Sequence, residues 1–217
     1  MFEIVINYWP GLLRGLGQTL AICTAVWAIS VPAGSLVGLF AFTMPKSAGV
    51  IVRICAFFLG SIPPLILLFW FHFPLQAILG VRIDPVWTII LTLTVVDIFA
   101  VAEITRWAYS RVPQSLRYLG WVSGLRRSQI FMEIELPTLI RHASAPILFS
   151  QIVVLHASLF GSLISVEELF RVGQRINAVE YQPVEVYSVV GLMFLLITIP
   201  LNLISFWVSR RSGGNSQ

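Results

Sequence analysis

The chain has 217 residues, of which 57% are hydrophobic and only 11% are charged, with a formal net charge of +4. About a quarter of the residues of an average soluble protein are charged, so this composition excludes an ordinary soluble domain. Together with a mean hydropathy of +0.87, it indicates an integral membrane protein.

Uncharged runs long enough to cross a bilayer recur along the chain. A hydrocarbon core about 30 Å thick needs roughly 20 helical residues. We therefore expect five transmembrane helices, at residues 17–42, 54–73, 85–106, 146–166 and 186–209. The second run contains Ser61-Ile62-Pro63-Pro64, which should kink or unwind its helix. The predicted fold is one all-α, polytopic membrane domain over residues 1–217.

Positive charges are distributed unevenly around these spans. With five spans and the N-terminus outside, ten of the 14 Lys and Arg residues fall on the cytoplasmic side, where such residues are enriched. Most of them lie in a basic insert from Arg106 to Arg141, whose loop comprises residues 107–141. The insert and the C-terminus are therefore expected in the cytoplasm.

Within the insert, two short helices are expected, at residues 115–124 and 128–135. Leu136-Pro137 should end the second one, because proline disfavours the helical conformation of the residue before it. Two interpretations are open: a solvated connecting loop, or a docking surface that receives force from a soluble partner.

Two residues inside the spans are candidates for a solute path. Asp97 lies within the third span, where a carboxylate is costly and by default faces the bundle interior or a wet cavity. It is a candidate for the translocation path of a cationic solute, and the alternative is a structural hydrogen bond to a neighbouring helix. His156, in the fourth span, is the second path candidate, with a packed, hydrogen-bonded position as its alternative.

Glu103 and Arg106 are three residues apart and share a helix face at the cytoplasmic end of the third span. By themselves they predict a simple surface pair. The sequence contains no metal-ligand spacing, no phosphate-binding glycine loop and no Ser/His/Asp arrangement. We expect no catalytic residue, no metal and no cofactor bound by this chain.

The segment AEITRWAYSRVP, followed by Gly124-Leu125 and then Leu136-Pro137, resembles the permease subunit of bacterial ABC importers for polar amino acids of the histidine, glutamine, arginine and opine type. Further matching pieces are Gly17-Gln18-Thr19-Leu20, Pro63-Pro64-Leu65, Ser158-Leu159 and Val166-Glu167-Glu168-Leu169. Each piece is weak, but their order and spacing are specific, and the resemblance covers nearly the whole chain.

The resemblance implies a type I ABC importer permease fold in the bacterial inner membrane, with the N-terminus outside. The subunit would form half of a pore and perform no chemistry. The implied partners are a second permease (a paralogue or self), two cytoplasmic ATPase subunits that bind ATP and Mg, and a periplasmic or lipid-anchored substrate-binding protein. No nucleic acid is involved.

The resemblance also implies roles for particular residues. Because the family motif retains both Glu103 and Arg106, it favours a structural clamp that fixes how the insert leaves the membrane. Residues that couple the permease to the ATPase would be Arg117, Tyr118, Gly124, Leu125, Arg126, Arg127, Leu136 and Pro137. On the outer face, Glu167 and Glu168 are candidates to receive the binding protein, unless they are simply solvated.

The chain departs from the family pattern in two places. Tyr118-Leu119-Gly120 stands where the family usually has Glu-Ala-Ala, and Leu155-His156-Ala157 where it has Lys-Asp-Thr. These departures indicate a divergent member, for example the second partner of a heterodimeric pore, and question the standard ATPase contact. A secondary transporter, which usually shows more spans and internal repeats, and a membrane scaffold are the alternatives. The sequence leaves open which solute is carried and whether the pore is a homodimer.

Overall fold

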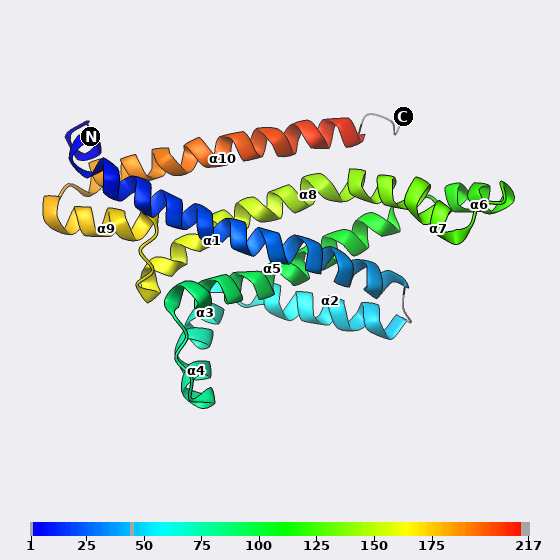
Figure 1. Ribbon diagram of the computed structural model, residues 1–217, viewed down its shortest axis with the longest axis horizontal. Coiled ribbons are helices and arrows are strands. Elements are labelled where there is room, and N and C mark those ends of the chain that lie inside the picture. The colour runs from blue at the N-terminus through cyan, green and yellow to red at the C-terminus, as the bar shows by residue number, and fades with distance from the viewer. Residues whose placement is uncertain (1, 44–45, 214–217) are drawn as a thin grey trace.

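The computed structural model describes residues 2–43 and 46–213, and every regular element within these ranges is helical. Long helices run along the length of the molecule (Figure 1): α1 (Phe2–Thr43), α5 (Pro85–Ser110), α8 (Leu136–Ala157) and α10 (Pro183–Gly213). α1 packs along α5, α5 packs on α8, and α8 packs on α10. In the described part of the chain, four helical segments are long and apolar enough to cross a membrane.

A bent pair of helices makes a further passage. α2 (Lys46–Ser61) stops at the predicted break, and the chain bends by 92° before it continues as α3 (Pro64–His72) and α4 (Pro74–Leu79). Pro63 and Pro64 have no backbone N–H to donate, so a continuous helix is interrupted there. The predicted break of the second span is confirmed, and counting the pair as one span raises the total to five.

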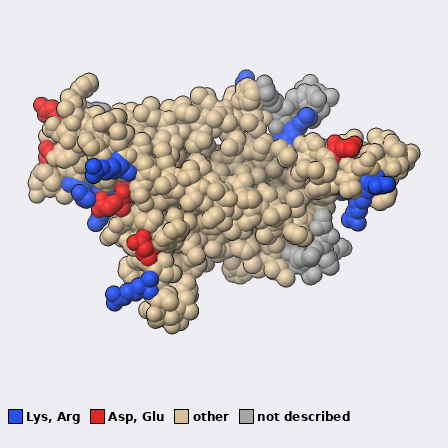
Figure 2. All heavy atoms as spheres, in the orientation of Figure 1, with Lys and Arg blue, Asp and Glu red and all other residues tan. Residues whose placement is uncertain are grey.

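Short helices occupy the two ends of the molecule (Figure 1). α6 (Gln114–Val122) and α7 (Arg127–Ile130) lie at one end, and α9 (Leu169–Glu180) lies at the other, beside the start of α1. Figure 2 shows charged side chains gathered toward these ends, with a broad uncharged region between them. This separation suits a bilayer, in which charged groups are costly.

α1 begins at Phe2, well before the expected span at residues 17–42, because its first turns are packed. Ile4 and Leu12 are buried in a hydrophobic cluster with residues of α9 and α10, including Leu169. The N-terminal segment therefore continues the first membrane helix.

Two glycines let α1 approach α5 closely. A Cβ at Gly34 would lie 2.6 Å from the carbonyl oxygen of Ile98, and one at Gly38 would lie 2.4 Å from that of Ala102. Real side chains do not tolerate such distances, so only glycine permits this crossing. Small residues four apart are a common means of packing membrane helices. Gly34 and Gly38 thus form the centre of what we call the α1–α5 seam.

Leu136-Pro137 does not end the second insert helix. The chain passes from α7 through the π-helical turn η1 (Phe131–Glu135) directly into α8, with Pro137 in the first turn of α8. The backbone N–H of Leu136 donates to the carbonyl of Phe131, five residues earlier. This wider turn accommodates the proline ring, which would clash with a carbonyl in a regular α-helix. The predicted helix end is wrong, and the insert continues without a break into the helix of the fourth span.

Candidate functional site

The first insert helix, α6, buries its small residue and exposes its large ones. Gly120 faces Ile130 so closely that a Cβ would lie 2.9 Å from the Cγ1 atom of Ile130. Tyr118, Leu119 and Val122 are 67%, 61% and 87% exposed. Exposed apolar side chains gathered on a short helix mark an interaction surface. The geometry therefore favours the docking interpretation of the insert over the solvated loop.

A tight turn connects the two insert helices. Gly124 has a positive φ of 76°, and the N–H of Leu125 donates to the carbonyl of Gly120 over 3.1 Å. This is the glycine-terminated helix end that only a residue without Cβ adopts freely. Arg126 and Arg127 follow it and are exposed, with the backbone N–H of Arg126 donating to the Gln129 side chain over 2.8 Å. The turn thus places both arginines on the surface.

Behind α6, Arg117 is held by a carboxylate and two aromatic rings. Its Nε atom lies 2.7 Å from Oε1 of Glu135, and the Tyr109 hydroxyl donates to Oε2 of the same carboxylate. The guanidinium carbon lies 4.8 Å from the ring centroid of Tyr109 and 5.9 Å from that of Phe42. We call these four residues the cytoplasmic cluster, because the insert is predicted to lie in the cytoplasm. The cluster joins the ends of α1 and α5 to α6 and η1.

Of the four residues of the cytoplasmic cluster, Arg117 is among the predicted coupling residues, and the other three are not. One usable signal for Glu135 is its position as a carboxylate among many arginines, directly before Leu136-Pro137. Tyr109 and Phe42 carry no such signal, because aromatic residues are common throughout the chain. Their role follows from the packing of helices that are remote in sequence.

Asp97 is buried where α1, α5 and α8 meet, with 2% of its surface exposed. The Ser30 hydroxyl donates to Oδ2 over 2.6 Å, and the Ser150 hydroxyl donates to Oδ1 over 2.6 Å. The Gln151 amide adds a third hydrogen bond over 3.1 Å. We call these four residues the membrane cluster. All three donors are neutral and come from α1 and α8, so Asp97 ties three helices together, and a direct role in translocation stays a prediction.

His156 lies apart from this arrangement, on the surface of α8. Its neighbours Leu155 and Ala157 are buried, whereas His156 is exposed. Phe149 and Val153, two turns and one turn earlier, are also exposed, at 61% and 52%. In the isolated chain His156 is thus not packed inside the bundle, and this face of α8 is available to lipid, to a second subunit or to a transport path.

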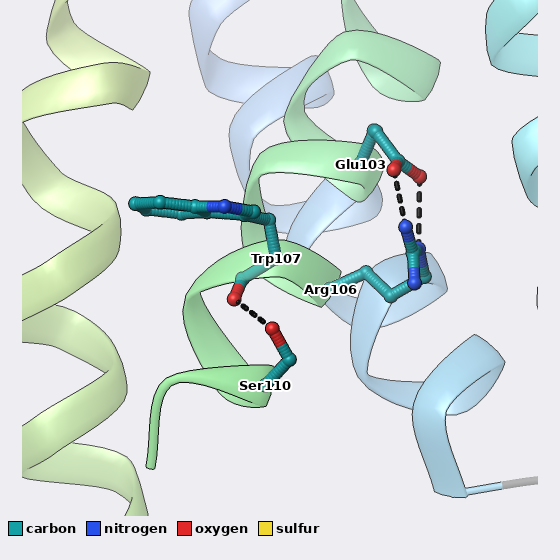
Figure 3. A network of polar contacts seen from close by, with 4 residues as sticks. All are labelled: Glu103, Arg106, Trp107 and Ser110. Atoms are coloured by element: carbon teal, nitrogen blue, oxygen red, sulfur yellow. Dashed lines mark hydrogen bonds and ion pairs between the residues drawn. The ribbon is translucent and has the colours of Figure 1, made fainter.

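Glu103 and Arg106 form a two-pronged ion pair within α5 (Figure 3). Nε of Arg106 donates to Oε2 of Glu103 over 2.9 Å, and Nη2 donates to Oε1. Trp107 points to the opposite side of the helix, and the Ser110 hydroxyl donates to the Trp107 carbonyl over 2.6 Å (Figure 3). The pair lies near the end of α5 but joins residues of one helix only, so its role as a clamp for the insert stays a prediction.

On the opposite end of the molecule, the two neighbouring glutamates differ. Glu167 is exposed and pairs with Arg175 over 2.7 Å, whereas Glu168 is 0% exposed. Glu168 caps α9 by accepting the backbone N–H groups of Phe170 and Arg171 over 2.8 and 2.7 Å. Burial raises the pKa of Glu168 to about 7, although these two hydrogen bonds lower it. The prediction of an exposed Glu168 that receives a soluble protein is therefore wrong.

The helical bundle, with its apolar spans and basic insert, defines a multi-span membrane protein. A family model described as the binding-protein-dependent transport system inner membrane component matches residues 30–213. The chain belongs to this family.

Curated relatives agree with this membership. The glutamine transport system permease protein GlnP of Escherichia coli is 28% identical over 211 residues, which cover 94% of each chain. The histidine/lysine/arginine/ornithine transport system permease protein HisQ of the same organism is 23% identical over 92% of each chain. The probable amino-acid ABC transporter permease protein YckA of Bacillus subtilis is 26% identical over 90% of this chain and 86% of its own length. The chain thus matches these permeases over most of its length and of theirs.

Solved structures show the same fold. A chain of an amino acid ABC transporter crystallised with histidines superposes with a TM-score of 0.86, at 20% identity, over 97% of this chain and 98% of that one. The MetNI methionine ABC transporter gives a TM-score of 0.72 at 21% identity, over 95% and 98% of the two chains. The predicted type I importer permease fold is confirmed. Family membership does not favour a secondary transporter or a scaffold.

Proposed function

We propose that this chain forms half of the pore of an ATP-driven importer for a polar amino acid or an amino-acid derivative. Its curated relatives are named for glutamine and for histidine, lysine, arginine and ornithine. The observation that carries the proposal is the exposed apolar face of α6 at Tyr118, Leu119 and Val122. A permease that works with a separate motor needs such a face, whereas a self-sufficient carrier does not.

The partners that we propose are two cytoplasmic ATPase subunits, a second permease and a substrate-binding protein outside the membrane. ATP and Mg would be bound by the ATPase subunits, and this chain would bind no cofactor. The face of α8 that exposes Phe149, Val153 and His156 suits contact with the second permease or with the solute. The binding protein would approach the end of the molecule that carries α9.

We propose the orientation with the N-terminus outside and the C-terminus in the cytoplasm. Figure 1 supports it, because α1 begins beside α9 whereas α10 ends toward the opposite end, where α6 and α7 lie. The insert at that end carries Arg111, Arg117, Arg126 and Arg127, which the positive-inside tendency assigns to the cytoplasm.

The proposed mechanism begins when closure of the ATP-bound ATPase dimer displaces α6. Arg117 transmits this displacement to α5 and α8 through Tyr109 and Glu135. The α1–α5 seam and the membrane cluster around Asp97 make α1 move with them. The helices would then rock as a unit and expose the path to the outer side.

Purification of the complex from its native host in mild detergent, followed by mass spectrometry, tests the proposal. An ATPase and a second permease should be retained, and uptake into proteoliposomes should require ATP and the binding protein. A chain that is purified alone and whose uptake depends on an ion gradient would support the secondary transporter instead.

Variants of the insert test the coupling role. Reversing the charges of Arg126 and Arg127, or placing proline at Ser123, should uncouple uptake from ATP hydrolysis while the spans stay folded. Wild-type uptake in these variants would count heavily against the proposed coupling. Arg14→Glu, at an exposed position of α1 far from the insert, is a suitable control.

A further inference from the structure

A large open cavity lies beside the first insert helix, between α6, α7 and the ends of α1 and α5. Its volume is about 770 Å³. The lining residues are aromatic, basic and polar: Phe42, Tyr109, Arg117, Trp121, Arg127, Ser128, Ile130, Phe131 and Glu135. The lining therefore includes all four residues of the cytoplasmic cluster.

The charges in the cavity do not balance. Arg117 and Arg127 contribute two positive charges, and Glu135 is the single carboxylate in the lining. Both oxygens of Glu135 are already engaged, one by Arg117 and the other by the Tyr109 hydroxyl. Nη2 of Arg117 is buried and has no hydrogen-bond partner, and Nε, although it lies 2.7 Å from Oε1 of Glu135, is not aligned for a hydrogen bond. A buried donor without an acceptor costs about 1–3 kcal/mol, so the site lacks one acceptor and one negative charge.

A carboxylate supplies both. It matches the planar guanidinium fork and makes short, charge-assisted hydrogen bonds with it. The volume also exceeds that of one carboxyl group, so the occupant brings neighbouring atoms that contact the aromatic walls formed by Phe42, Tyr109 and Trp121. An acidic side chain on a protein loop has this chemistry and this size.

The surface around the cavity favours a protein over a lipid headgroup. Trp121, at the cavity, is 60% exposed, and Tyr118, Leu119 and Val122 of the same helix are exposed as well. A contiguous apolar surface next to an unbalanced charge resembles the apolar core of a protein interface with its anchoring ion pair.

We propose that this cavity receives a loop of the partner ATPase that places an Asp or Glu side chain against Arg117 and Arg127. The inference rests on the proposed function and adds a second point of contact, in which the permease accepts a group of the ATPase. The ATPase would then contact the permease at two places, the exposed face of α6 and the cavity. The ion pair in the cavity would keep the two proteins attached when the ATPase moves away from the membrane as well as toward it.

Site-specific cross-linking in the assembled complex tests where the loop lies. The photo-reactive residue p-benzoylphenylalanine would replace Ser128, which lines the cavity, or Tyr181, which is 84% exposed beside α9 as a control. We expect cross-links from position 128, and none from position 181, to an ATPase peptide that contains Asp or Glu. Cross-links from position 128 only to lipid or to the permease itself, or no cross-links there, would overturn the inference.

Charge reversal tests the anchor itself. Arg127→Glu should reduce ATPase retention about tenfold, equivalent to about 1.4 kcal/mol, and a Lys at the cross-linked ATPase carboxylate should restore it. Arg111→Glu is the matched control, because Arg111 stacks on Trp107 at 4.8 Å. If Arg127→Glu retains the ATPase as well as the control does, the inference fails and the proposed function stands. If the wild-type chain retains no ATPase, the proposed function fails as well.

Discussion

Two buried carboxylates, Asp97 and Glu135, are surrounded by different partners. Asp97 accepts hydrogen bonds from three neutral side chains of α1 and α8. Glu135 is bound by Arg117 and Tyr109, and the arginine has a donor to spare. In the membrane cluster the carboxylate of Asp97 has hydrogen-bond donors within the chain, whereas in the cytoplasmic cluster Arg117 still lacks an acceptor. The difference indicates that the first holds helices together and that the second is built to take a partner.

The two clusters lie along one helix pair. Ser30, Gly34, Gly38 and Phe42 follow one another along α1 at a spacing of four residues, so each lies next to the one before it. Ser30 contacts Asp97 and Phe42 packs edge-on against Tyr109, with ring centroids 4.4 Å apart. A twelve-residue separation corresponds to about 18 Å of helix. The α1–α5 seam therefore links the site that would receive force to the site inside the membrane.

The largest expected effect is at the seam, because both clusters depend on it. Gly38→Leu would force side-chain atoms into the carbonyl of Ala102, and overpacking typically costs 1–3 kcal/mol or more. We expect loss of folded protein, seen as aggregation in size-exclusion chromatography. Gly17→Leu is the matched control, because a Cβ at Gly17 has no neighbour within 4 Å. If the two variants gave the same amount of aggregate, the close contact of α1 and α5 at Gly38 would not be needed for folding.

Removing the charge of Glu135 tests the cytoplasmic cluster without changing the membrane cluster. Glu135→Gln leaves Arg117 without its counter-ion, which we expect to lower stability by about 2 kcal/mol, since Arg117 keeps 24% exposure. Thermal unfolding in detergent measures this loss. Adding Arg117→Met should recover part of it, because the unpaired charge is then gone. A double variant less stable than Glu135→Gln would show that the pair is not coupled.

A third buried carboxylate, Glu168, should make the stability of the protein depend on pH. Its folded-state pKa of about 7 lies above the ordinary value of 4.5, because burial penalises the charged form. The folded state therefore holds this proton to higher pH, and the associated stability is lost as pH rises from about 4.5 through 7. Relative to Glu168→Gln, the wild type should lose about 1–3 kcal/mol between about pH 5 and pH 8. Parallel unfolding curves for the two proteins would refute this.

The smallest change in stability is expected at Asp97. In Asp97→Asn the serine hydroxyls can reorient, so we expect a loss of about 1 kcal/mol. Uptake in proteoliposomes should nevertheless fall while the purified complex keeps its subunits, because the three helices no longer move as one. Thr24→Val, at an exposed position of α1, controls for a polar-to-apolar change. Unchanged uptake in Asp97→Asn would remove Asp97 from the mechanism.

The sequence by itself determined the membrane class, the break at Pro63-Pro64 and the basic insert with its Gly124 turn. These features depend on local properties: hydropathy over about 20 residues, missing proline N–H groups and the freedom of glycine at positive φ. Each can be deduced without knowing what the segment contacts.

Only the tertiary structure decided which partners the buried charges have. Ser30 and Asp97 are 67 residues apart, and Tyr109 and Glu135 are 26 apart, so neither contact leaves a local pattern. The burial of Glu168 and the passage of a helix through Pro137 were mispredicted for the same reason. A carboxylate or a proline has a default environment, and packing against distant helices overrides it.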